Sequence, residues 1–205
     1  MNFHFDWEKY YAKTPLEKIP WYYTQADYFI KLLNSGKLGT GKALDLGCGV
    51  GAKSIILAKK GFKVTGIDIS PTAICYARKN AKKEKVGVRF IAADTSDISF
   101  LKDEKFDFVL DWANLHGIPK SKRKKYIKQI IQHTQRGSKI LLRCFSRYRV
   151  KEELGFLSPV GLIYLFSKED IKNLFGKHFK FLETNRSKPR NHPGKWFDEY
   201  LMERL

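Results

Sequence analysis

The sequence predicts an α/β fold: a doubly wound, mostly parallel sheet with helices on both faces and a C-terminal antiparallel hairpin. Within residues 42–145, short apolar runs alternate with segments of helix length. Such alternation is typical of successive βαβ units, whose strands pair in parallel and whose helices cover both faces of the sheet. The last two apolar runs follow each other without an intervening helix, which is typical of an antiparallel hairpin.

The individual strands and helices follow from these runs in order. Five runs are predicted as strands of the parallel part: 42–46 (KALDL), 63–67 (KVTGI), 87–92 (GVRFIA), 106–110 (FDFVL) and 138–145 (SKILLRCF). The segments between them predict helices at 53–60, 71–83 and 121–135. Ser70 and Pro71 suit the cap and the first turn of the second helix, and Gly137 suits the end of the third.

The flanks of this alternating region differ from it. Residues 1–40 are aromatic and predict helix before the first strand. After Ser146 a less regular stretch precedes a helix at 168–175, and two further strands, 179–184 and 195–205, bring the predicted sheet to seven strands. We expect residues 1–205 to form a single domain, with a core at 41–205 and an N-terminal cap at 1–40.

The composition is that of a globular protein apart from its charge. Apolar residues make up 43% of the 205 residues, and the net charge is +18 at pH 7. The N-terminus (MNFHFDWEKYY) lacks the pattern of a signal peptide, and no apolar run approaches the roughly 18 residues of a membrane span. Cys48, Cys75 and Cys144 lie far apart, without metal-ligand spacing. We therefore expect a cytoplasmic protein without a metal site.

The positive charge is concentrated in one part of the chain. Between Trp112 and Lys151 there are twelve basic residues and no acid: Lys120, Lys122, Arg123, Lys124, Lys125, Lys128, Arg136, Lys139, Arg143, Arg147, Arg149 and Lys151. Such a stretch attracts anions, which include phosphates and small acidic substrates. A solvated lysine-rich surface explains the same composition, so both interpretations stay open.

A glycine-rich turn follows the first predicted strand. Gly47, Gly49 and Gly51 stand between that strand and a helix, an arrangement that brings a nucleotide-like ligand against bare backbone at a helix N-terminus. As G-x-G-x-x-A, with Ala52 in the last position, the turn also fits the dinucleotide fingerprint of dehydrogenases. Asp45 decides against that alternative, because a carboxylate beside the turn repels a pyrophosphate but attracts the cationic S-adenosylmethionine.

Acidic residues stand at the ends of three successive strands. Asp45 ends the first, Asp68 the second and Asp94 the third. A carboxylate at the position of Asp68 can accept hydrogen bonds from both hydroxyls of a ribose, and a side chain at the position of Asp94 can accept from an adenine amino group. Together with the glycine turn, these acids predict a site for S-adenosylmethionine.

The chain resembles a known family along two stretches. ALDLGCGVGAKSIILAKKGFKVTGIDISPTAI (43–74) is close to the pattern of the class I S-adenosylmethionine-dependent methyltransferases, and FDFVLDWANLHGIP (106–119) occupies the place of their fourth-strand motif. IPWYYTQAD (19–27), LLRCFSRYR (141–149) and LFSKEDIKNLFG (165–176) are similar to the small-molecule branch that includes thiopurine, thiol and tellurite methyltransferases. The resemblance covers most of the chain and implies a Rossmann-like, seven-stranded sheet.

The resemblance also implies roles for individual residues. Those expected to hold S-adenosylmethionine are Asp45, Gly47, Cys48, Gly49, Gly51, Asp68, Ile69, Asp94, Thr95, Asp111, Trp112 and Trp21. Within this set, Ile69 would pack on the adenine, Asp111 and Trp112 would close the methionine end, and Trp21 would belong to a lid over the cofactor. An ordinary core aromatic is an equal interpretation of Trp21.

Candidate residues for the methyl acceptor follow the fourth and fifth strands. His116 is the titratable candidate for a catalytic base, and a polar loop residue or helix cap is its alternative. Cys144 lies inside the fifth strand and is expected in the core. Arg143, Arg147, Tyr148 and Arg149 are expected near the substrate entrance, where arginines suit carboxylate or phosphate. We therefore expect a small-molecule acceptor, with an acid or a thiol as candidates.

Two other functions remain as alternatives. The basic residues 120–151 could track the phosphates of RNA, or dock a protein substrate, and aromatic residues near the N-terminus could stack bases. Against nucleic acid, DWAN (111–114) lacks both prolines of the base-amino methylating branch. A non-catalytic regulator that binds S-adenosylmethionine is the second alternative. The oligomeric state does not follow from the sequence.

Overall fold

The fold was obtained as a computed structural model that describes residues 6–19, 27–149, 155–158, 161–188 and 194–205. Its main element is a seven-stranded sheet in the order β3-β2-β1-β4-β5-β9-β8. The strands are β1 (Lys42–Leu46), β2 (Lys63–Asp68), β3 (Val88–Ala92), β4 (Phe106–Trp112), β5 (Thr134–Ser146), β8 (Phe179–Ser187) and β9 (Trp196–Arg204). β1 to β5 pair in parallel, and β9 pairs antiparallel with both β5 and β8. The predicted fold class is confirmed.

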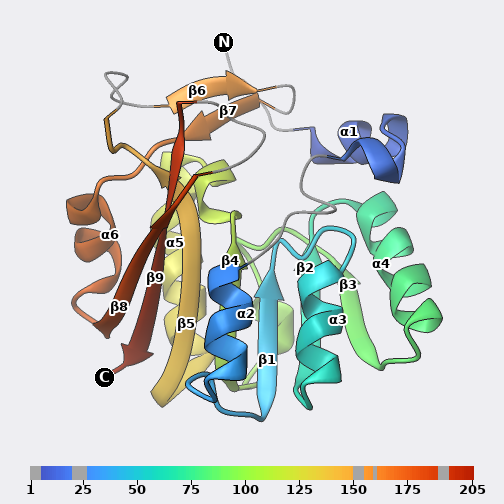
Figure 1. The fold of residues 1–205 in the computed structure, drawn as a ribbon, viewed down its shortest axis with the longest axis horizontal. Helices are drawn as coiled ribbons and strands as arrows, with labels where there is room; N and C mark the ends of the chain where they lie inside the picture. Colours follow the sequence, from blue (N-terminus) through green and yellow to red (C-terminus); the bar gives the residue numbers. More distant parts are fainter. Residues whose placement is uncertain (1–5, 20–26, 150–154, 159–160, 189–193) are drawn as a thin grey trace.

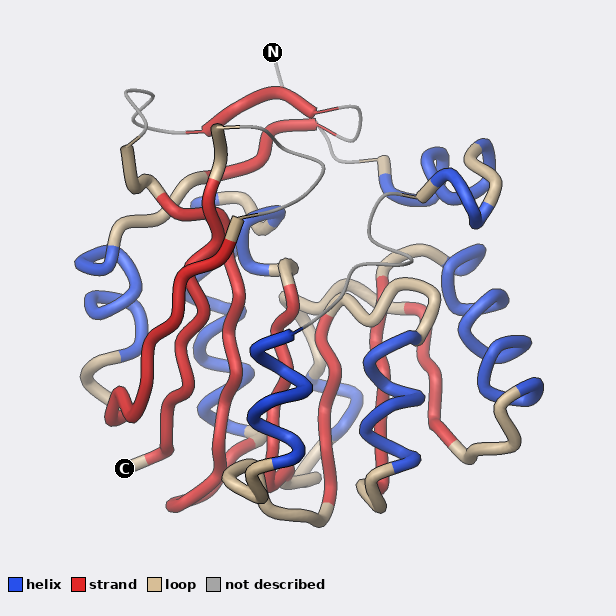
Figure 2. Tube along the Cα trace, viewed as in Figure 1, coloured by secondary structure: helices blue, strands red, loops and turns tan. Residues whose placement is uncertain are grey.

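Helices cover both faces of the sheet, as Figures 1 and 2 show. They are α1 (Trp7–Lys13), α2 (Asp27–Asn34), α3 (Ala52–Lys59), α4 (Pro71–Lys83), α5 (Lys120–Gln132) and α6 (Lys168–Phe175). Alternation along β1 assigns the faces: Ala43 packs with residues of α2 and α3, whereas Leu44 packs with residues of α5 and α6. Each face therefore buries its own apolar cluster against the sheet.

The helix end predicted at Ser70 is confirmed, whereas the one predicted at Gly137 is wrong. The Ser70 hydroxyl accepts a hydrogen bond from the backbone N–H of Ala73 at 3.0 Å and caps α4, whose first residue is Pro71. Gly137 does not close α5, which ends at Gln132. Instead, Gly137 lies inside β5 with a φ of +85°, close to a break in the register between β4 and β5.

Two structural units lie beyond the carboxyl ends of the parallel strands. One is α1, and the other is a small sheet of β6 (Gly155–Ser158) and β7 (Gly161–Tyr164), which the sequence did not predict. Figure 1 shows α1 above α4, and β6 and β7 above the ends of β4 and β5. Ligands of open α/β sheets bind at this edge, so these units border the candidate site. In the part of the chain that the structure describes, no helix is long and apolar enough to cross a membrane.

Candidate functional site at the carboxyl ends of the strands

The turn after β1 requires glycine for two reasons. Gly47, Gly49 and Gly51 all lie in the left-handed region, with φ values of 71°, 54° and 82°. Close neighbours add the second reason. A Cβ on Gly47 would lie 2.6 Å from Oδ1 of Asn114, and one on Gly49 would lie 2.8 Å from the Tyr11 hydroxyl. The nearest neighbours of these two positions are thus the protein's own side chains.

Asp45 is a buried carboxylate at the end of β1. Its Oδ2 accepts a hydrogen bond from the Ser54 hydroxyl at 2.6 Å. Burial raises the pKa of Asp45 to about 6, although the Ser54 hydrogen bond and the charge of Lys53 act in the opposite direction. In the adjoining turn, the backbone N–H of Cys48 donates to the carbonyl of Ile67, which ties the turn to the end of β2.

Asp68 is the equivalent carboxylate at the end of β2. It accepts hydrogen bonds from the backbone N–H of Gly49 at 2.8 Å and of Ser70 at 2.9 Å. Burial raises its pKa to about 6 as well. Among the described residues, neither Asp68 nor Asp45 forms an ion pair. Next to Asp68, the side chain of Ile69 is 50% exposed.

Asp94 is engaged within the protein. Its carboxylate accepts from the Lys122 ammonium at 2.7 Å and from the backbone and hydroxyl of Ser96. Burial opposes ionisation here, but the hydrogen bonds from Lys122 and Ser96 hold the pKa of Asp94 below its usual value. Its neighbour Thr95 is buried and accepts a hydrogen bond from Asn114 at 3.1 Å. The carboxylate expected to accept from the adenine is therefore already paired with Lys122 of α5.

Asp111 faces the protein interior. One of its oxygens accepts from the Tyr126 hydroxyl at 2.6 Å, and the carboxylate also accepts from the backbone N–H groups of Asn114 and Leu115. Burial raises the pKa of Asp111 to about 6. In the structure, this acid anchors the loop after β4 to α5 through Tyr126.

Trp112 ends β4 on the face of the sheet that α2 and α3 cover. The guanidinium carbon of Arg143 lies 4.6 Å from the centre of its ring and 3.8 Å from that of Phe197. The Lys53 ammonium lies 6.0 Å from the Trp112 ring centre. The indole N–H of Trp112 is buried and has no hydrogen-bond partner in the described part of the chain.

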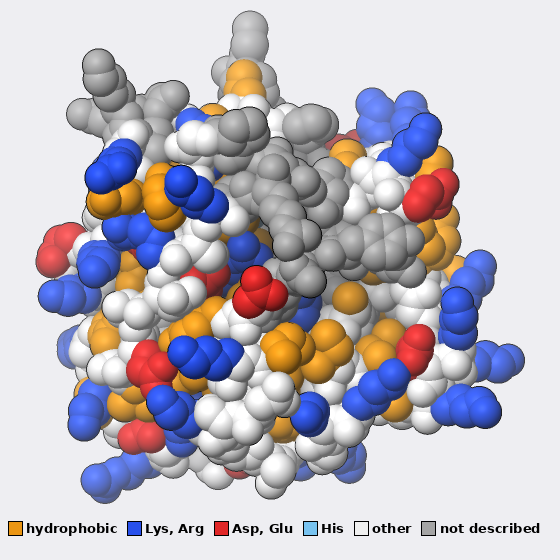
Figure 3. Space-filling view, in the orientation of Figure 1, with side chains coloured by type: hydrophobic (Ala, Val, Ile, Leu, Met, Phe, Trp, Pro, Cys, Tyr) orange, Lys and Arg blue, Asp and Glu red, His pale blue; other side chains and the backbone are white. Residues whose placement is uncertain are grey.

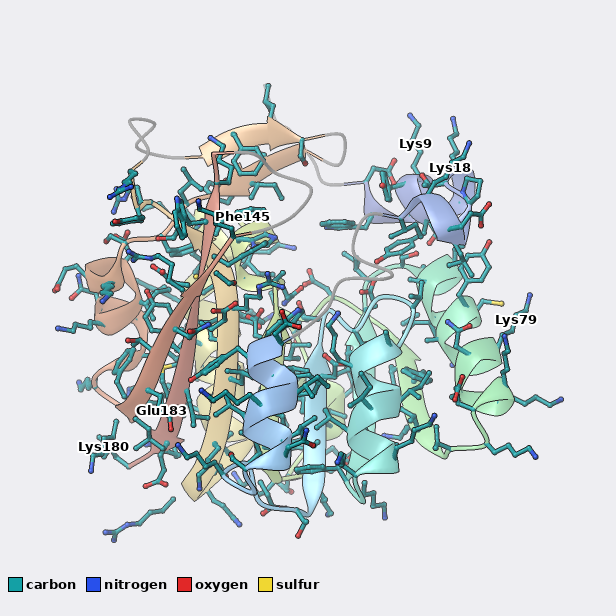
Figure 4. All side chains as sticks on the ribbon, in the orientation of Figure 1. Lys9, Lys18, Lys79, Phe145, Lys180 and Glu183 are labelled. Atoms are coloured by element: carbon teal, nitrogen blue, oxygen red, sulfur yellow. The ribbon has the colours of Figure 1, made fainter. Side chains whose placement is uncertain are left out.

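His116 lies in a buried aromatic cluster. It is 4% exposed, and its ring centre lies 4.9 Å from that of Phe145 and 6.3 Å from that of Phe197. Phe156 of β6 packs edge-on against Phe145, which Figure 4 labels below β6 and β7. The cluster also includes Ala113, a non-glycine residue with a φ of +75°, which follows Trp112. Strained backbone of this kind is concentrated at functional sites.

The two arginines that follow β5 have separate partners. Arg147 forms an ion pair with Asp170 at the start of α6. Arg149 lies over the ring of Tyr148, which is also covered by Arg186 at 3.8 Å. The contacts of the described residues therefore do not join these arginines and Arg143 into one anion cluster.

The structure adds residues that sequence reasoning missed. Trp21 lies outside the described residues, but Tyr11 of α1 reaches the glycine turn. Glu8 holds α1 in place, because its carboxylate accepts from the hydroxyls of Ser70 and Thr72, both at 2.5 Å. The aromatic residues of segment 1–40 were predicted to lie in helix, whereas nothing in the local sequence marked Glu8.

Comparison with known proteins agrees with this geometry. Residues 43–137 match the model of a methyltransferase domain family. A methyltransferase of Schizosaccharomyces pombe is 36% identical over 125 residues, which are 58% of this chain and 85% of that protein. The 2-heptyl-1-hydroxyquinolin-4(1H)-one methyltransferase of Mycobacteroides abscessus is 27% identical over 73% of this chain, which spans 63% of that enzyme.

Solved structures share the fold. TehB of Haemophilus influenzae superposes with a TM-score of 0.71 at 21% identity, over 97% of this chain and 67% of TehB. Magnesium protoporphyrin IX methyltransferase of Synechocystis superposes with a TM-score of 0.69 at 22% identity, over 87% of this chain and 77% of the enzyme. With the glycine turn, the acids that end β1 and β2 and the family match, the chain belongs to the class I S-adenosylmethionine-dependent methyltransferases.

Proposed function

We propose that this enzyme transfers a methyl group from S-adenosylmethionine to a small-molecule acceptor, with the donor held at the turn after β1. The observation that supports this site is the pair of buried acids, Asp45 and Asp68, which have raised pKa values and no ion-pair partner in the described chain. A cationic ligand with ribose hydroxyls would compensate both carboxylates. The residues present therefore fit the donor.

Different residues around the turn would contact different parts of the donor. Asp45 would face its charged methionine half, Asp68 its ribose hydroxyls and Ile69 its adenine. The remaining residues proposed to contact it are Gly47, Cys48, Gly49, Gly51, Thr95 and Trp112, with Trp21 in the lid. Asp94 and Asp111 would act indirectly, since the Lys122 ammonium already pairs with Asp94 and the Tyr126 hydroxyl already donates to Asp111.

Methyl transfer requires little of the protein beyond positioning the donor and the acceptor. S-adenosylmethionine supplies a methyl group on a sulfonium, and the neutral thioether is a leaving group that needs no activation by an acid. The chain would exclude water through α1 and the aromatic cluster, and His116 is the candidate to hold or accept a proton from the acceptor. We also propose that residues 1–205 act as one unit in which residues 1–40 cap the core.

The aromatic side chains above β4 and β5 would suit a small and partly apolar acceptor. The aromatic cluster around Phe145 and His116 reaches the strained Ala113 beside the donor site. The M. abscessus relative is named for a hydroxyquinolinone, also a small aromatic molecule.

The three cysteines are unbridged, which supports a reducing compartment and therefore the cytoplasm.

RNA or protein as acceptor is less well supported. Lys122 and Lys125 of the basic helix α5 are paired with Asp94 and Asp97. Figure 3 shows the opposite face, which α2 and α3 cover, and there Lys and Arg side chains are spread over both edges of the molecule. The ion pairs of Lys122 and Lys125 leave fewer cations of α5 available to phosphates.

Two measurements test the proposal. In calorimetric titrations, Asp45→Asn and Asp68→Asn should each weaken binding of S-adenosylhomocysteine by about tenfold or more, whereas the exposed Asp103→Asn should not. Undiminished affinity in both variants would rule out this donor site. Methyl-labelled S-adenosylmethionine, incubated with the enzyme and a size-fractionated cell extract, should label small molecules. Label found only in RNA or protein would refute the small-molecule acceptor.

A further inference from the structure

Several cations lie on aromatic rings where β5 ends and β9 begins. The Lys188 ammonium lies 4.8 Å from the centre of the Trp196 ring, and the guanidinium carbon of Arg149 lies 5.1 Å from that of Tyr148. The two rings meet edge to face with their centres 5.5 Å apart. Arg186 also lies over Tyr148, at 3.8 Å. Aromatic side chains thus hold three cations at this end of the sheet.

The ring contacts position the cations without cancelling their charge, because an aromatic ring is neutral. Within the described residues, Arg149 and Lys188 form no ion pair, whereas Arg186 is paired with an acid of β9. The opposite holds on α5, where acids neutralise Lys122 and Lys125. Positive charge is therefore available to a ligand at the ends of β5 and β9.

The start of β9 connects these cations to the aromatic cluster of the candidate site. Lys195, which precedes β9, has its ammonium 5.0 Å from the ring centre of Phe156, and Phe156 packs edge-on against Phe145. Two positions after Lys195, Phe197 stacks on Phe145 with ring centres 4.1 Å apart. Since successive residues of an extended chain lie about 3.4 Å apart, Lys195 and Trp196 border the cluster directly.

Exposure decreases from the cations toward the cluster. Arg149 and Lys188 are exposed, Lys195 and Phe156 are half-buried, and Phe145 is buried. Arg149 also has a φ of +56°, which is uncommon for a residue other than glycine and is found preferentially at functional sites. A molecule that entered along this path would meet positive charge first and apolar rings further in.

We propose that a basic patch, formed by Arg149, Lys188 and Lys195, binds an acidic group of the methyl acceptor while the aromatic cluster binds its rings. The acceptor is then a small aromatic acid with a carboxylate or a phosphate, the groups that arginine and lysine side chains bind best. The proposal rests on the proposed function, because the cluster is the acceptor site given there. An RNA strand needs a longer track of cations, and Lys122 and Lys125 are not available to extend this one.

Three probes that share a naphthalene ring test the proposal. 2-Naphthoate carries a carboxylate, 2-naphthyl phosphate carries a phosphate, and 2-naphthamide is a neutral analogue of the first. Each is titrated calorimetrically into enzyme saturated with S-adenosylhomocysteine. At low salt the wild type should bind at least one anion about tenfold more tightly than the amide, and this preference should shrink at high salt, since exposed charges are screened. The anion with the larger preference identifies the acidic group.

Two triple variants separate the patch from the overall charge. The first changes the patch and should bind the anions and the amide about equally: Arg149→Gln, Lys188→Gln and Lys195→Gln. The second removes the same charge around the carboxyl end of α4, beyond the opposite edge of the sheet, and should keep the wild-type preference: Lys82→Gln, Lys83→Gln and Lys85→Gln. Both start from the same net charge of +18, so a general attraction of anions would fall equally in both.

The exposed single changes Arg149→Gln and Lys188→Gln give the same comparison if the patch variant does not fold, and each should lower the preference about two- to threefold. A wild type that binds no anion more tightly than the amide would overturn the proposal, as would an equal preference in the two triple variants. So would a patch variant that loses affinity for a short oligouridylate but not for the naphthalene anions, because the patch would then bind RNA.

Failure of the proposed function has a different signature. A wild type that does not bind S-adenosylhomocysteine would refute the donor site. The three probes, titrated into the ligand-free protein and its variants, would then decide by themselves whether the patch binds an aromatic acid.

Discussion

Replacing Asp68 by asparagine should remove a pH-dependent loss of stability from the ligand-free protein while it weakens donor binding by about tenfold or more. Burial raises the pKa of Asp68 from 3.8 to about 6, so the folded state binds its proton more tightly than the unfolded state. The stabilisation is complete below the unfolded pKa and is lost as the pH rises through the folded pKa. At neutral pH the folded protein therefore holds an unfavourable charge, which asparagine lacks.

The size of the effect follows from the two pKa values. A difference of about two units, at 1.36 kcal/mol per unit, corresponds to about 3 kcal/mol over the full titration. Between about pH 4.5 and about pH 7.5, roughly 2 kcal/mol of this should be observed. The free energy of unfolding of Asp68→Asn, relative to that of the wild type, should thus improve by roughly 2 kcal/mol over this range.

Urea unfolding of both proteins at the two pH values measures this difference, and the subtraction removes every group that the variant leaves unchanged. Saturating S-adenosylhomocysteine should stabilise the wild type much more than the variant, because the variant lacks the carboxylate proposed to accept from the ribose. A relative stability that stays constant, or moves in favour of the wild type as the pH rises, would refute the reasoning on Asp68.

Three further predictions concern the elements around the site. Tyr126→Phe should lower the free energy of unfolding by about 2 kcal/mol in thermal unfolding, since it removes a hydrogen bond to the buried Asp111 carboxylate; an unchanged Tm would contradict this. Glu8→Gln should weaken docking of α1 and raise protease cleavage near residue 13, with Glu17→Gln as the control. Gly49→Ala should reduce donor affinity at least tenfold, because its φ and the Tyr11 hydroxyl both oppose a side chain; unaltered affinity would show that the turn tolerates a Cβ.

The sequence predicted the sheet well because its evidence is local. The apolar runs, the glycine turn after β1 and Ser70 with Pro71 each depend on neighbours within a few residues, and all lie where expected. Gly137 was misassigned for the same reason: a glycine in the left-handed region ends a helix or bends a strand equally well, and β-pairing with β4 decided between them.

The missed parts of the site depend on contacts between distant segments. Lys122 reaches Asp94 from 28 positions away, and Glu8 reaches Thr72 from 64 positions away. No periodicity or spacing encodes such pairs. In the sequence, Asp111 and Asp45 cannot be told apart, because each is an acid near the end of an apolar strand. Only the packing of Tyr126 under β4 distinguishes the structural acid from the one beside the turn.

The two buried carboxylates of the site favour a ligand that carries positive charge. Asp45 and Asp68 lie at the carboxyl ends of the neighbouring strands β1 and β2, have raised pKa values and form no ion pair within the described residues. A ligand with a cationic centre and hydroxyls would compensate both carboxylates, whereas a simple anion would compensate neither. The same uncompensated carboxylates make the ligand-free state less stable than it could be, which is why substitutions that stabilise this edge of the sheet should cost activity.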